Sequence, residues 1–472
     1  MEIPVPTEYD NPIVDDFLFD IPKPPQAATP TGQTQATVAV AVNAHVWEVY
    51  DYHWPETFAP PQIGQRVTVP FGRVKKPRAG VVVDPQSRSV LGGRIKPIAE
   101  LLDPIPAIDE CLLELGQWIS RYYLCPLGMV LCAMVPSAVG RHGERREAVA
   151  RLRAEPAEWP AHLGAKQRRV LDELLEARRQ GVEPLTVEQL LHHAEAHRDT
   201  LKRLVGRELI RLDSRPVSLD EPTGDLQGDP FEINADQQAV LDAMSPKLAE
   251  GFSVTLLHGV TGSGKTEVYL RAIREVNAAG KQAIMLVPEI ALATQTLTRL
   301  LERLPGVAVM HSGLTDAQRA FSWAKIREGE AQVIVGPRSA VFAPCPNLGL
   351  IIVDEEHEAT YKQDTLPRYH GRDVAVKRAA IEDIPIVLGS ATPSLESIHN
   401  VREGRYDKLL LPRRVQGLDM PTLELVNLRK EVRHDHRIEL IGQTLTNRMA
   451  ETLDRNEQII LLMNRRGYAN YV

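Results

Sequence analysis

The chain has 472 residues, of which 43% are hydrophobic and 25% are charged, and its formal net charge is −7. This length exceeds what a single hydrophobic core supports, so we expect about three domains. The composition is that of an ordinary globular protein, and no apolar run approaches the ~18 residues that a membrane span needs, which excludes a membrane-spanning protein.

The first 36 residues carry six acidic side chains against one basic side chain and are rich in Pro, Gln and Thr. This composition predicts a disordered acidic tail over 1–36. Two phenylalanines stand among acids at 14–22, which is typical of a docking peptide.

The start of the chain lacks the basic and apolar segments of a signal peptide, so we expect a cytoplasmic protein with no membrane partner. Disulfides are rare in that compartment, and no two cysteines have the C-x₂-C spacing of a zinc site. The cysteines are therefore expected to be buried free thiols: Cys111, Cys125, Cys132 and Cys345.

From Ala36 the pattern becomes that of β-strands. Apolar stretches at 37–42, 46–52, 65–72 and 80–84 are separated by Gly and Pro, and a helical pattern runs over 108–123. This spacing predicts a small β-rich domain over 37–140. Four basic residues gather at 73–78, either as a solvated hairpin tip or as a phosphate contact.

Three helical segments follow at 165–179, 187–196 and 198–212, and the last ends in an extended stretch at 210–212. Thr186 and Gln189 have the spacing of a capping box at the start of the second segment. Short helices followed by a strand are compatible with a winged helix over 160–215. Pro and Gly mark 216–230 as a linker. The third segment is basic, which suits a solvated face or a DNA contact, through Arg198, Lys202, Arg203 and Arg207.

Strand and helix patterns then alternate over 231–435. Nearly continuous apolar runs separated by helices are typical of a parallel sheet that helices cover on both faces. The predicted fold class is therefore α/β, with strands near 254–257, 283–287, 307–310, 332–335, 350–354 and 384–388.

A glycine-rich loop joins the first of these strands to a helix predicted at 267–279. A strand, a Gly-x₄-Gly-Lys-Thr loop and a helix, in that order, predict a phosphate-binding loop, because glycines let successive N–H groups point at an anion. Lys265 is expected to reach the β- and γ-phosphates of ATP, and Thr266 to hold Mg²⁺. The loop residues are Gly259, Val260, Thr261, Gly262, Ser263, Gly264, Lys265 and Thr266.

A later strand of the predicted sheet ends in acidic residues, in the stretch from Leu350 to His357. The carboxyl ends of parallel strands share one crevice with the phosphate-binding loop. Asp354 is therefore expected to bind Mg²⁺, and Glu355 to orient and deprotonate the attacking water. Together with Lys265, these are the predicted catalytic residues.

Three further stretches are typical of a helicase motor rather than a kinase or GTPase. A hydroxylated loop, Ser390-Ala391-Thr392, can sense the γ-phosphate and couple it to nucleic acid. Gln237 precedes the first strand, and its amide could bond an adenine edge. Rings and guanidinium groups follow the acidic residues, where they suit base stacking and phosphate binding or, equally, packing between domains: Tyr361, Arg368, Tyr369, His370 and Arg372.

Together these motifs resemble those of the superfamily-two DNA helicases, and among them the bacterial replication-restart helicases. The resemblance covers roughly residues 37–472. It implies a RecA-like helicase lobe with ATP and Mg²⁺ as cofactors, preceded by a DNA-end-binding domain and a winged helix, and the start of a second lobe at 436–472. The matching stretches are Gly259–Tyr269, Val287–Leu292, His311–Gly313, Asp354–His357, Tyr361–Gln363, Arg368–His370, Ser390–Glu396 and Asn464–Tyr468.

The resemblance also implies how such a chain meets DNA. The β-rich segment would capture a DNA 3′ end, with Asp51 accepting a hydrogen bond from the 3′-hydroxyl between Tyr50 and Tyr52. Members of the family unwind abandoned forks with 3′→5′ polarity. Their partners are forked DNA, single-strand-binding protein, and the primosome and helicase-loader proteins that restart replication. In the motor lobe the predicted DNA contacts are Arg338, Lys362, Arg368, Tyr369 and Arg372.

Two departures from the family pattern bear on activity. Residues 1–36 have no obvious counterpart, and the sequence reaches Val472 without the family's zinc-binding cysteines, so zinc is expected only of the full-length family. Such motors use a second-lobe arginine on the γ-phosphate, worth about 10³–10⁵ in rate in related NTPases. Residues 1–472 are therefore expected to bind ATP·Mg²⁺ weakly and DNA ends normally, but scarcely to unwind. Two other interpretations stay open: a non-catalytic DNA-end-binding protein with a decayed motor lobe, and another superfamily-two nucleic-acid translocase.

Overall fold

The computed structural model divides the chain into two compact units, 1–415 and 416–472. No helix in the described part of the chain is both long enough and apolar enough to cross a membrane. The predicted tail lies outside the described residues except for Ala36. The described residues are 36–72, 76–87, 95–136, 139, 146–154, 156, 159–160, 162–179, 184–194, 196–216, 232–288, 300–311, 314, 316–415, 422–427 and 441–462.

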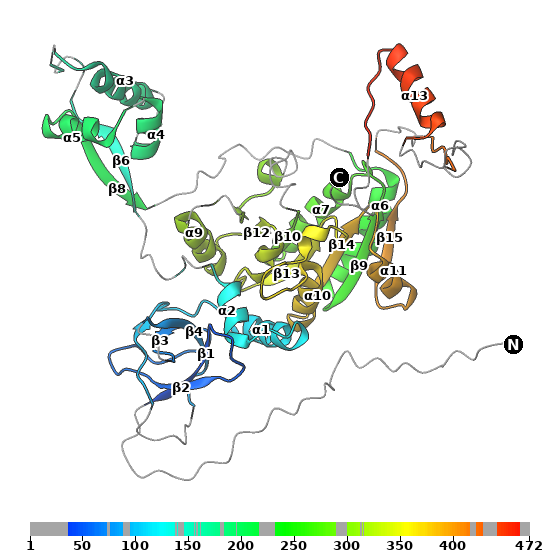
Figure 1. The fold of residues 1–472 in the computed structure, drawn as a ribbon, viewed down its shortest axis with the longest axis horizontal. Coiled ribbons are helices and arrows are strands. Elements are labelled where there is room, and N and C mark those ends of the chain that lie inside the picture. The colour runs from blue at the N-terminus through cyan, green and yellow to red at the C-terminus, as the bar shows by residue number, and fades with distance from the viewer. Residues whose placement is uncertain are drawn as a thin grey trace, which may run out of the picture. The chain divides into compact units, whose positions relative to one another are not determined.

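The first part of unit 1 is an antiparallel sheet of five strands in the order β2-β1-β4-β3-β5 (Figure 1). Two helices cover it, and Gly128 lets the second approach closely, because a Cβ there would lie 2.0 Å from the carbonyl oxygen of Val42. This confirms the predicted β-rich segment, although the strand predicted at 46–52 begins only at Tyr50. The elements are β1 (Thr37–Val42), β2 (Tyr50–His53), β3 (Arg66–Val69), β4 (Arg78–Asp84), β5 (Glu100–Leu101), α1 (Glu110–Tyr122) and α2 (Leu127–Met134).

A separate small core is built from three helices and a three-stranded sheet of order β7-β6-β8. Its central strand β6 (Arg146–Leu152) lies outside the range 160–215 that was predicted for a winged helix. The helix predicted to reach residue 212 ends at Gly206 because the chain turns at Glu208, with φ 55°, into β8 (Ile210–Pro216). The other elements are α3 (Ala165–Arg179), β7 (Leu185–Thr186), α4 (Val187–His193) and α5 (Arg198–Gly206).

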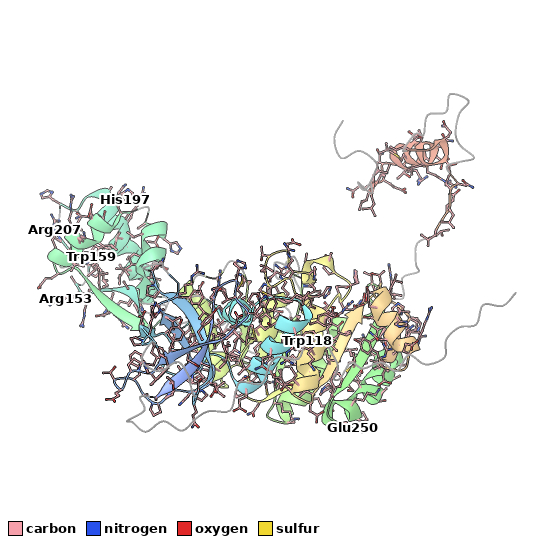
Figure 2. The ribbon with its side chains drawn as sticks, turned by 60° about the horizontal axis from the view of Figure 1, so that its bottom comes forward. Trp118, Arg153, Trp159, His197, Arg207 and Glu250 are labelled. Carbon is pink, nitrogen blue, oxygen red and sulfur yellow. The ribbon has the colours of Figure 1, made fainter. Side chains whose placement is uncertain are left out.

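The basic side of this small core remains open to both interpretations. Lys202, Arg203 and Arg207 are exposed on and just after α5, and Lys202 lies 3.8 Å from Asp199 (Figure 2). The side chains of Arg198, Thr186 and Gln189 lie outside those that the structure describes, as does the predicted capping box. Residues 73–75 of the other basic stretch also lie outside the described part, and so does the linker at 217–230.

The largest part of unit 1 is a parallel sheet of seven strands in the order β11-β12-β10-β13-β14-β9-β15 (Figure 1). Successive apolar residues of the inner strands belong to alternate cores, for example Ile284 and Met285, so both faces of the sheet are buried away from the edge strand β15, as the apolar runs predict. The strands are β9 (Ser253–Gly259), β10 (Gln282–Leu286), β11 (Val307–Val309), β12 (Val333–Gly336), β13 (Leu348–Val353), β14 (Pro385–Ser390) and β15 (Asp407–Leu411).

Helices and short 3₁₀ turns cover this sheet. They are α6 (Ala235–Ala249), α7 (Lys265–Ala278), α9 (Asp316–Arg327), η4 (Arg338–Phe342), η5 (Ala359–Tyr361), α10 (Gly371–Ile381) and α11 (Leu395–Arg402). Strand β15 was not predicted, and the compact unit ends at Val415, before the predicted lobe boundary at 435. In unit 2, α13 (Gln443–Asp454) has no buried residue.

The β-rich segment and the parallel-sheet lobe share a core. Helix α1 packs on α10, and Leu112, Leu115 and Ile119 from the first segment belong to the same apolar cluster as Ala375 and Ala379 from the second. The two parts therefore hold each other in place through buried apolar surface. All four cysteines are free, but Cys111 is exposed on α1, so the prediction of burial is wrong for it, while Cys125 and Cys345 are buried.

Candidate nucleotide site and its link to the DNA-binding segments

The glycine-rich loop lies between β9, which ends at Gly259, and α7, which begins at Lys265. Gly262 and Gly264 have φ angles of 79° and 84°, in the left-handed region that side chains with a Cβ rarely adopt. A Cβ on Gly259 would lie 2.6 Å from the Ser263 hydroxyl oxygen. The loop can therefore bend only because glycines stand at these positions.

The polar groups of this loop lack partners that would satisfy them. Lys265 is nearly buried, and its Nζ donates to the carbonyl of Gly259 at 3.0 Å and lies 3.9 Å from Glu355 Oε1. The buried hydroxyl of Ser263 has no hydrogen-bond partner among the described residues. A near-buried ammonium, an unpaired hydroxyl and a helix N-terminus together fit a polyanion such as the phosphates of ATP.

Asp354 and Glu355 follow β13 at the same edge of the sheet, as predicted. Burial, and after it the neighbouring charge of Glu355, raise the pKa of Asp354 to about 6. A divalent cation beside Asp354 would favour the ionised form of its carboxyl group. The site therefore suits a bound Mg²⁺ better than it suits an ionised Asp354 that has no cation beside it. Thr266 stands half-buried at the start of α7, on the loop side of the same sheet edge.

Two buried tyrosines hold Asp354 in place. The hydroxyl of Tyr269 donates to Asp354 Oδ1 at 3.0 Å, and that of Tyr361 donates to the Asp354 carbonyl at 2.7 Å. Gly389 makes room for this contact, since a Cβ there would lie 1.6 Å from the Tyr269 hydroxyl oxygen. Sequence reasoning missed Tyr269, although its position four residues after Lys265, on the same helix, is a usable signal.

The residue that follows Asp354 has a strained backbone. Glu355 adopts φ 45°, which is uncommon for a residue with a Cβ and is concentrated at functional sites. Its carboxylate is partly exposed and lies between Lys265 and His357, 3.6 Å from His357 Nδ1. This geometry leaves the Glu355 carboxylate free to meet a water molecule beside the half-buried Asp354.

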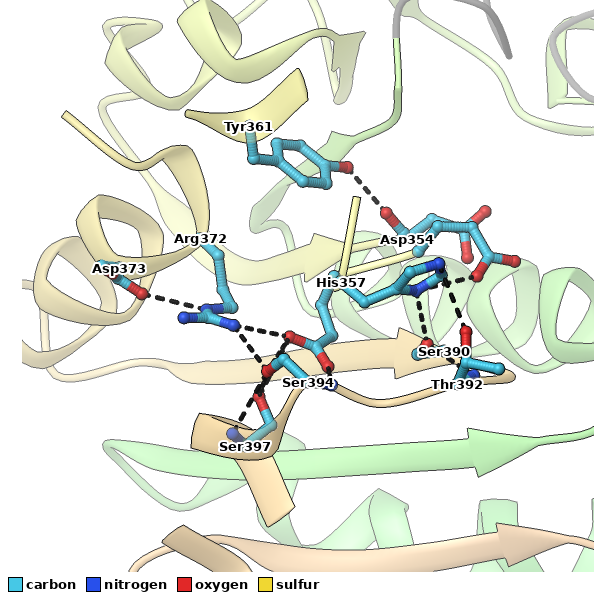
Figure 3. Close-up of polar contacts among 11 residues, drawn as sticks. Asp354, His357, Tyr361, Arg372, Asp373, Ser390, Thr392, Ser394 and Ser397 are labelled. Carbon is cyan, nitrogen blue, oxygen red and sulfur yellow. Dashed lines mark hydrogen bonds and ion pairs between the residues drawn. The ribbon is translucent and has the colours of Figure 1, made fainter. Parts of the chain in front are cut away.

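A chain of polar contacts leads from Glu355 through His357 to the predicted coupling loop (Figure 3). His357 Nδ1 lies 2.8 Å from the Ser390 hydroxyl, and His357 Nε2 lies 3.3 Å from the Thr392 hydroxyl. The Ser390 hydroxyl also accepts from the backbone N–H of Thr392 at 3.0 Å. A displacement of Glu355 or His357 would therefore change the polar contacts of Ser390 and Thr392. Ala391 lies between them and bonds to His258 through its backbone.

Glu356 is fully buried, and its carboxylate links α10 to the start of α11 (Figure 3). Its carboxylate accepts from Arg372 at 3.0 Å, from the backbone N–H and the hydroxyl of Ser394 at 2.7 and 3.0 Å, and from the Ser397 hydroxyl at 3.0 Å. Arg372 also pairs with Asp373 at 2.9 Å. Sequence reasoning did not give Glu356 or Ser394 a role.

The predicted DNA contacts of the lobe divide into two groups. Lys362 and Arg368 are exposed, whereas Tyr369 is 2% exposed and packs edge-on against Phe342 at 5.2 Å. Arg372 is 9% exposed and faces Glu356. In this structure Tyr369 and Arg372 have no surface for DNA, which favours the packing alternative for both of them.

Arg338 is half-buried and organises the same loop. Its guanidinium donates to the carbonyl of Thr360 at 2.6 Å and to that of Lys362 at 3.2 Å. Lys362 in turn donates to the carbonyl of Arg368 at 2.5 Å. The loop reaches the β-rich segment through Tyr123, whose hydroxyl accepts from the backbone N–H of His370 at 3.1 Å.

The three residues predicted to hold a DNA 3′ end do not converge. They lie on β2, the edge strand of the five-stranded sheet, where Tyr50 and Tyr52 face one apolar core and Asp51 faces the other way. Asp51 accepts from the Ser87 hydroxyl at 2.5 Å. A 3′-hydroxyl would therefore meet Asp51 without meeting both tyrosines.

Gln237 is buried, and both ends of its amide are already used. Its oxygen accepts from the backbone N–H of Asn234 at 3.0 Å in a capping box, and its nitrogen donates to the carbonyl of Ser263 at 3.2 Å. An adenine would have to compete with these bonds. What the structure shows directly is that Gln237 ties α6 to the glycine-rich loop.

Comparisons with known proteins agree with this architecture. Residues 38–136 match the family model for the PriA 3′DNA-binding domain, and residues 234–401 match the DEAD/DEAH box helicase family. By these matches and the parallel sheet, the lobe is similar to the DEAD/DEAH box helicase domains, a family that implies ATP and Mg²⁺.

The chain is similar to curated proteins named replication restart protein PriA. It is 33% identical to the protein of that name from Bacillus subtilis, 35% to that from Chlamydia trachomatis and 35% to that from Haemophilus influenzae, over 87%, 91% and 92% of this chain. The chain spans 58–59% of the length of these curated relatives. Among solved structures, RecG bound to a three-way DNA junction aligns with 41% of this chain and 24% of that chain at 24% identity, with a TM-score of 0.31, too low to support an argument.

Proposed function

We propose that this chain supplies the ATP-binding lobe and the DNA-end-binding domain of an ATP-dependent 3′→5′ DNA helicase that acts on stalled or abandoned forks in replication restart. The likeness to PriA supports this proposal. The observation that carries it is the bonded chain from Lys265 and Glu355 through His357 to Ser390 and Thr392, in a lobe that shares a core with the DNA-end-binding domain.

In this proposal the glycine-rich loop, from Gly259 to Thr266, binds the phosphates of ATP, with Lys265 neutralising their charge. Thr266 and Asp354 would hold Mg²⁺, which supplies further neutralisation of the phosphate oxygens. Glu355 orients the attacking water and accepts its proton. Lys265 is nearly buried and Asp354 is half-buried, so each of these electrostatic contacts is screened less than it would be in bulk water.

For DNA we propose that Asp51 receives a 3′ end and that Lys362 and Arg368 contact the backbone, with Arg338 shaping their loop. Ser390 and Thr392 would pass the state of the nucleotide to this surface. Forked DNA, single-strand-binding protein and primosome or helicase-loader proteins are the proposed partners, and the cytoplasm is the proposed location. The weak turnover expected of residues 1–472 stays a prediction.

Replacing Asp51 by alanine should abolish discrimination between DNA ends. A carboxylate that accepts from a 3′-hydroxyl contributes about 1.5–3 kcal/mol, so the unchanged chain should prefer a fork with a free 3′-hydroxyl over one with a 3′-phosphate by at least about tenfold. The measurement is competition binding of both forks by fluorescence anisotropy at fixed salt, because backbone affinity depends on salt.

Glu48→Ala is the matched control, because Glu48 is an exposed acid two residues before β2 and its loss removes the same charge. It should leave the preference intact. Equal preference in the Asp51→Ala variant and the unchanged chain would remove Asp51 from the proposed end-binding site.

A further inference from the structure

The segment that follows β15 lies along the glycine-rich loop. We call Pro412–Val415 the strap. Two backbone hydrogen bonds join this segment to the loop. Val260 N–H donates to the carbonyl of Leu411, just before the strap, at 3.2 Å, and Val415 N–H, at the end of the strap, donates to the carbonyl of Gly262 at 3.0 Å. The segment therefore runs alongside the loop, using the N–H of Val260 and the carbonyl of Gly262.

A bidentate ion pair joins the strap to α6. Arg413 donates to the two carboxylate oxygens of Asp236 at 2.7 and 2.6 Å. Asp236 directly precedes Gln237, which donates to the Ser263 carbonyl. The strap, α6 and the loop thus meet at one place, where a Cβ on Gly264 would lie 2.2 Å from Gln237 Nε2 and 3.0 Å from Val415 Cγ2.

Arg414 has a buried nitrogen without a partner. Its Cγ would lie 3.9 Å from a Cβ on Gly262, so the side chain runs beside the loop, and its Nε is buried with no hydrogen-bond acceptor among the described residues. A buried N–H without an acceptor is unfavourable, so a site that keeps one is expected to satisfy or cover it in another state.

We propose that Arg414 contacts the base and ribose half of the bound nucleotide, with its guanidinium stacked on the adenine ring, while Lys265 and the loop hold the phosphates. Arg414 runs beside Gly262, and the strap meets the loop next to Gln237, the residue whose amide was predicted to bond an adenine edge. A planar guanidinium is suited to stacking on a purine, and lysine is not. This inference rests on the proposed ATP site.

The test compares ATP·Mg²⁺ with tripolyphosphate·Mg²⁺, which has the phosphates but no nucleoside, by isothermal titration calorimetry on the full chain. Arg414→Ala should weaken ATP binding about tenfold, the size of a desolvated cation–π contact, and leave tripolyphosphate binding unchanged. Arg414→Lys should weaken ATP binding nearly as much, which excludes a simple charge effect. Arg402→Ala, an exposed arginine on α11, is the control and should change neither.

Two outcomes would overturn the assignment of Arg414 alone. In the first, Arg414→Ala binds ATP as the unchanged chain does. In the second, it loses ATP and tripolyphosphate equally, which would make Arg414 a phosphate contact. Lys265→Ala separates this inference from the proposed function, because it should weaken both ligands. If the unchanged chain bound neither ligand, the proposed function would fail and this inference with it.

Discussion

Replacing Lys265 by alanine should weaken ATP·Mg²⁺ binding about a hundredfold. Removing one member of a desolvated charge pair costs about 2–5 kcal/mol, and a hundredfold corresponds to about 2.7 kcal/mol. The free protein should keep its melting temperature, since Lys265 leaves behind only Glu355, which is partly exposed and pairs with His357. The measurement is the nucleotide-induced shift of the melting midpoint, supported by calorimetric titration.

At a ligand concentration of 100 times the dissociation constant, the unchanged chain gains about 2.7 kcal/mol of stability, and the variant should gain only about 0.4 kcal/mol. Lys281→Ala is a suitable control, because this exposed lysine lies beyond the far end of α7. If neither the unchanged chain nor the variant responded to ATP while both bound DNA ends, the interpretation as a non-catalytic DNA-end-binding protein would gain ground.

Elements with a strong local signal were predictable from the sequence. The glycine-rich loop and the six predicted strands of the parallel sheet are present, because each is an apolar run bounded by glycine, proline or polar residues. Strands β6 and β15 escaped prediction for opposite reasons. β6 mixes charged residues with Ala, Val and Leu, and β15 is a short edge strand that begins with two charged residues and buries only Leu411.

The site was predictable as a set of motifs and not as a set of contacts. Rings and guanidinium groups near an acidic motif have the same pattern whether they face DNA or a buried partner, and only the fold shows that Arg368 is exposed while Tyr369 and Arg372 are buried. Gln237 is different. The spacing Asn234-x-x-Gln237 is itself a capping-box signal, so the sequence did contain the competing use of that amide.

The strain at Glu355 could not be predicted from its residue type. Glutamate has no preference for positive φ, and the conformation arises where a buried strand must turn while Asp354 stays bonded to Tyr269 and Tyr361. The pairing of Glu356 with Arg372 is equally a long-range result, since 16 residues separate the two side chains. The backbone conformation of Glu355 and the Glu356–Arg372 pair both depend on tertiary contacts, which sequence motifs do not specify.

Arg372→Ala should destabilise the lobe by about 3–5 kcal/mol in the absence of DNA, because it leaves the fully buried carboxylate of Glu356 without a cation. For a lobe of this size the loss corresponds to a fall in the melting midpoint of roughly 6–20 °C. The transition to follow is the one that ATP·Mg²⁺ shifts. Adding Glu356→Gln to this variant removes the uncompensated charge and should restore part of the lost stability.

Arg368→Ala is the matched comparison, because Arg368 lies on the same segment but is exposed, and its guanidinium donates to the carbonyl of Asp364 at 3.1 Å. It should leave the melting midpoint within about 0.5 kcal/mol of the unchanged chain. Its DNA affinity should fall, and the slope of log affinity against log salt should decrease by about one. The reverse pattern, with a stable Arg372→Ala chain that has lost DNA affinity, would return Arg372 to the DNA surface. Comparing the two variants therefore distinguishes an arginine that stabilises the lobe, Arg372, from one that contacts DNA, Arg368.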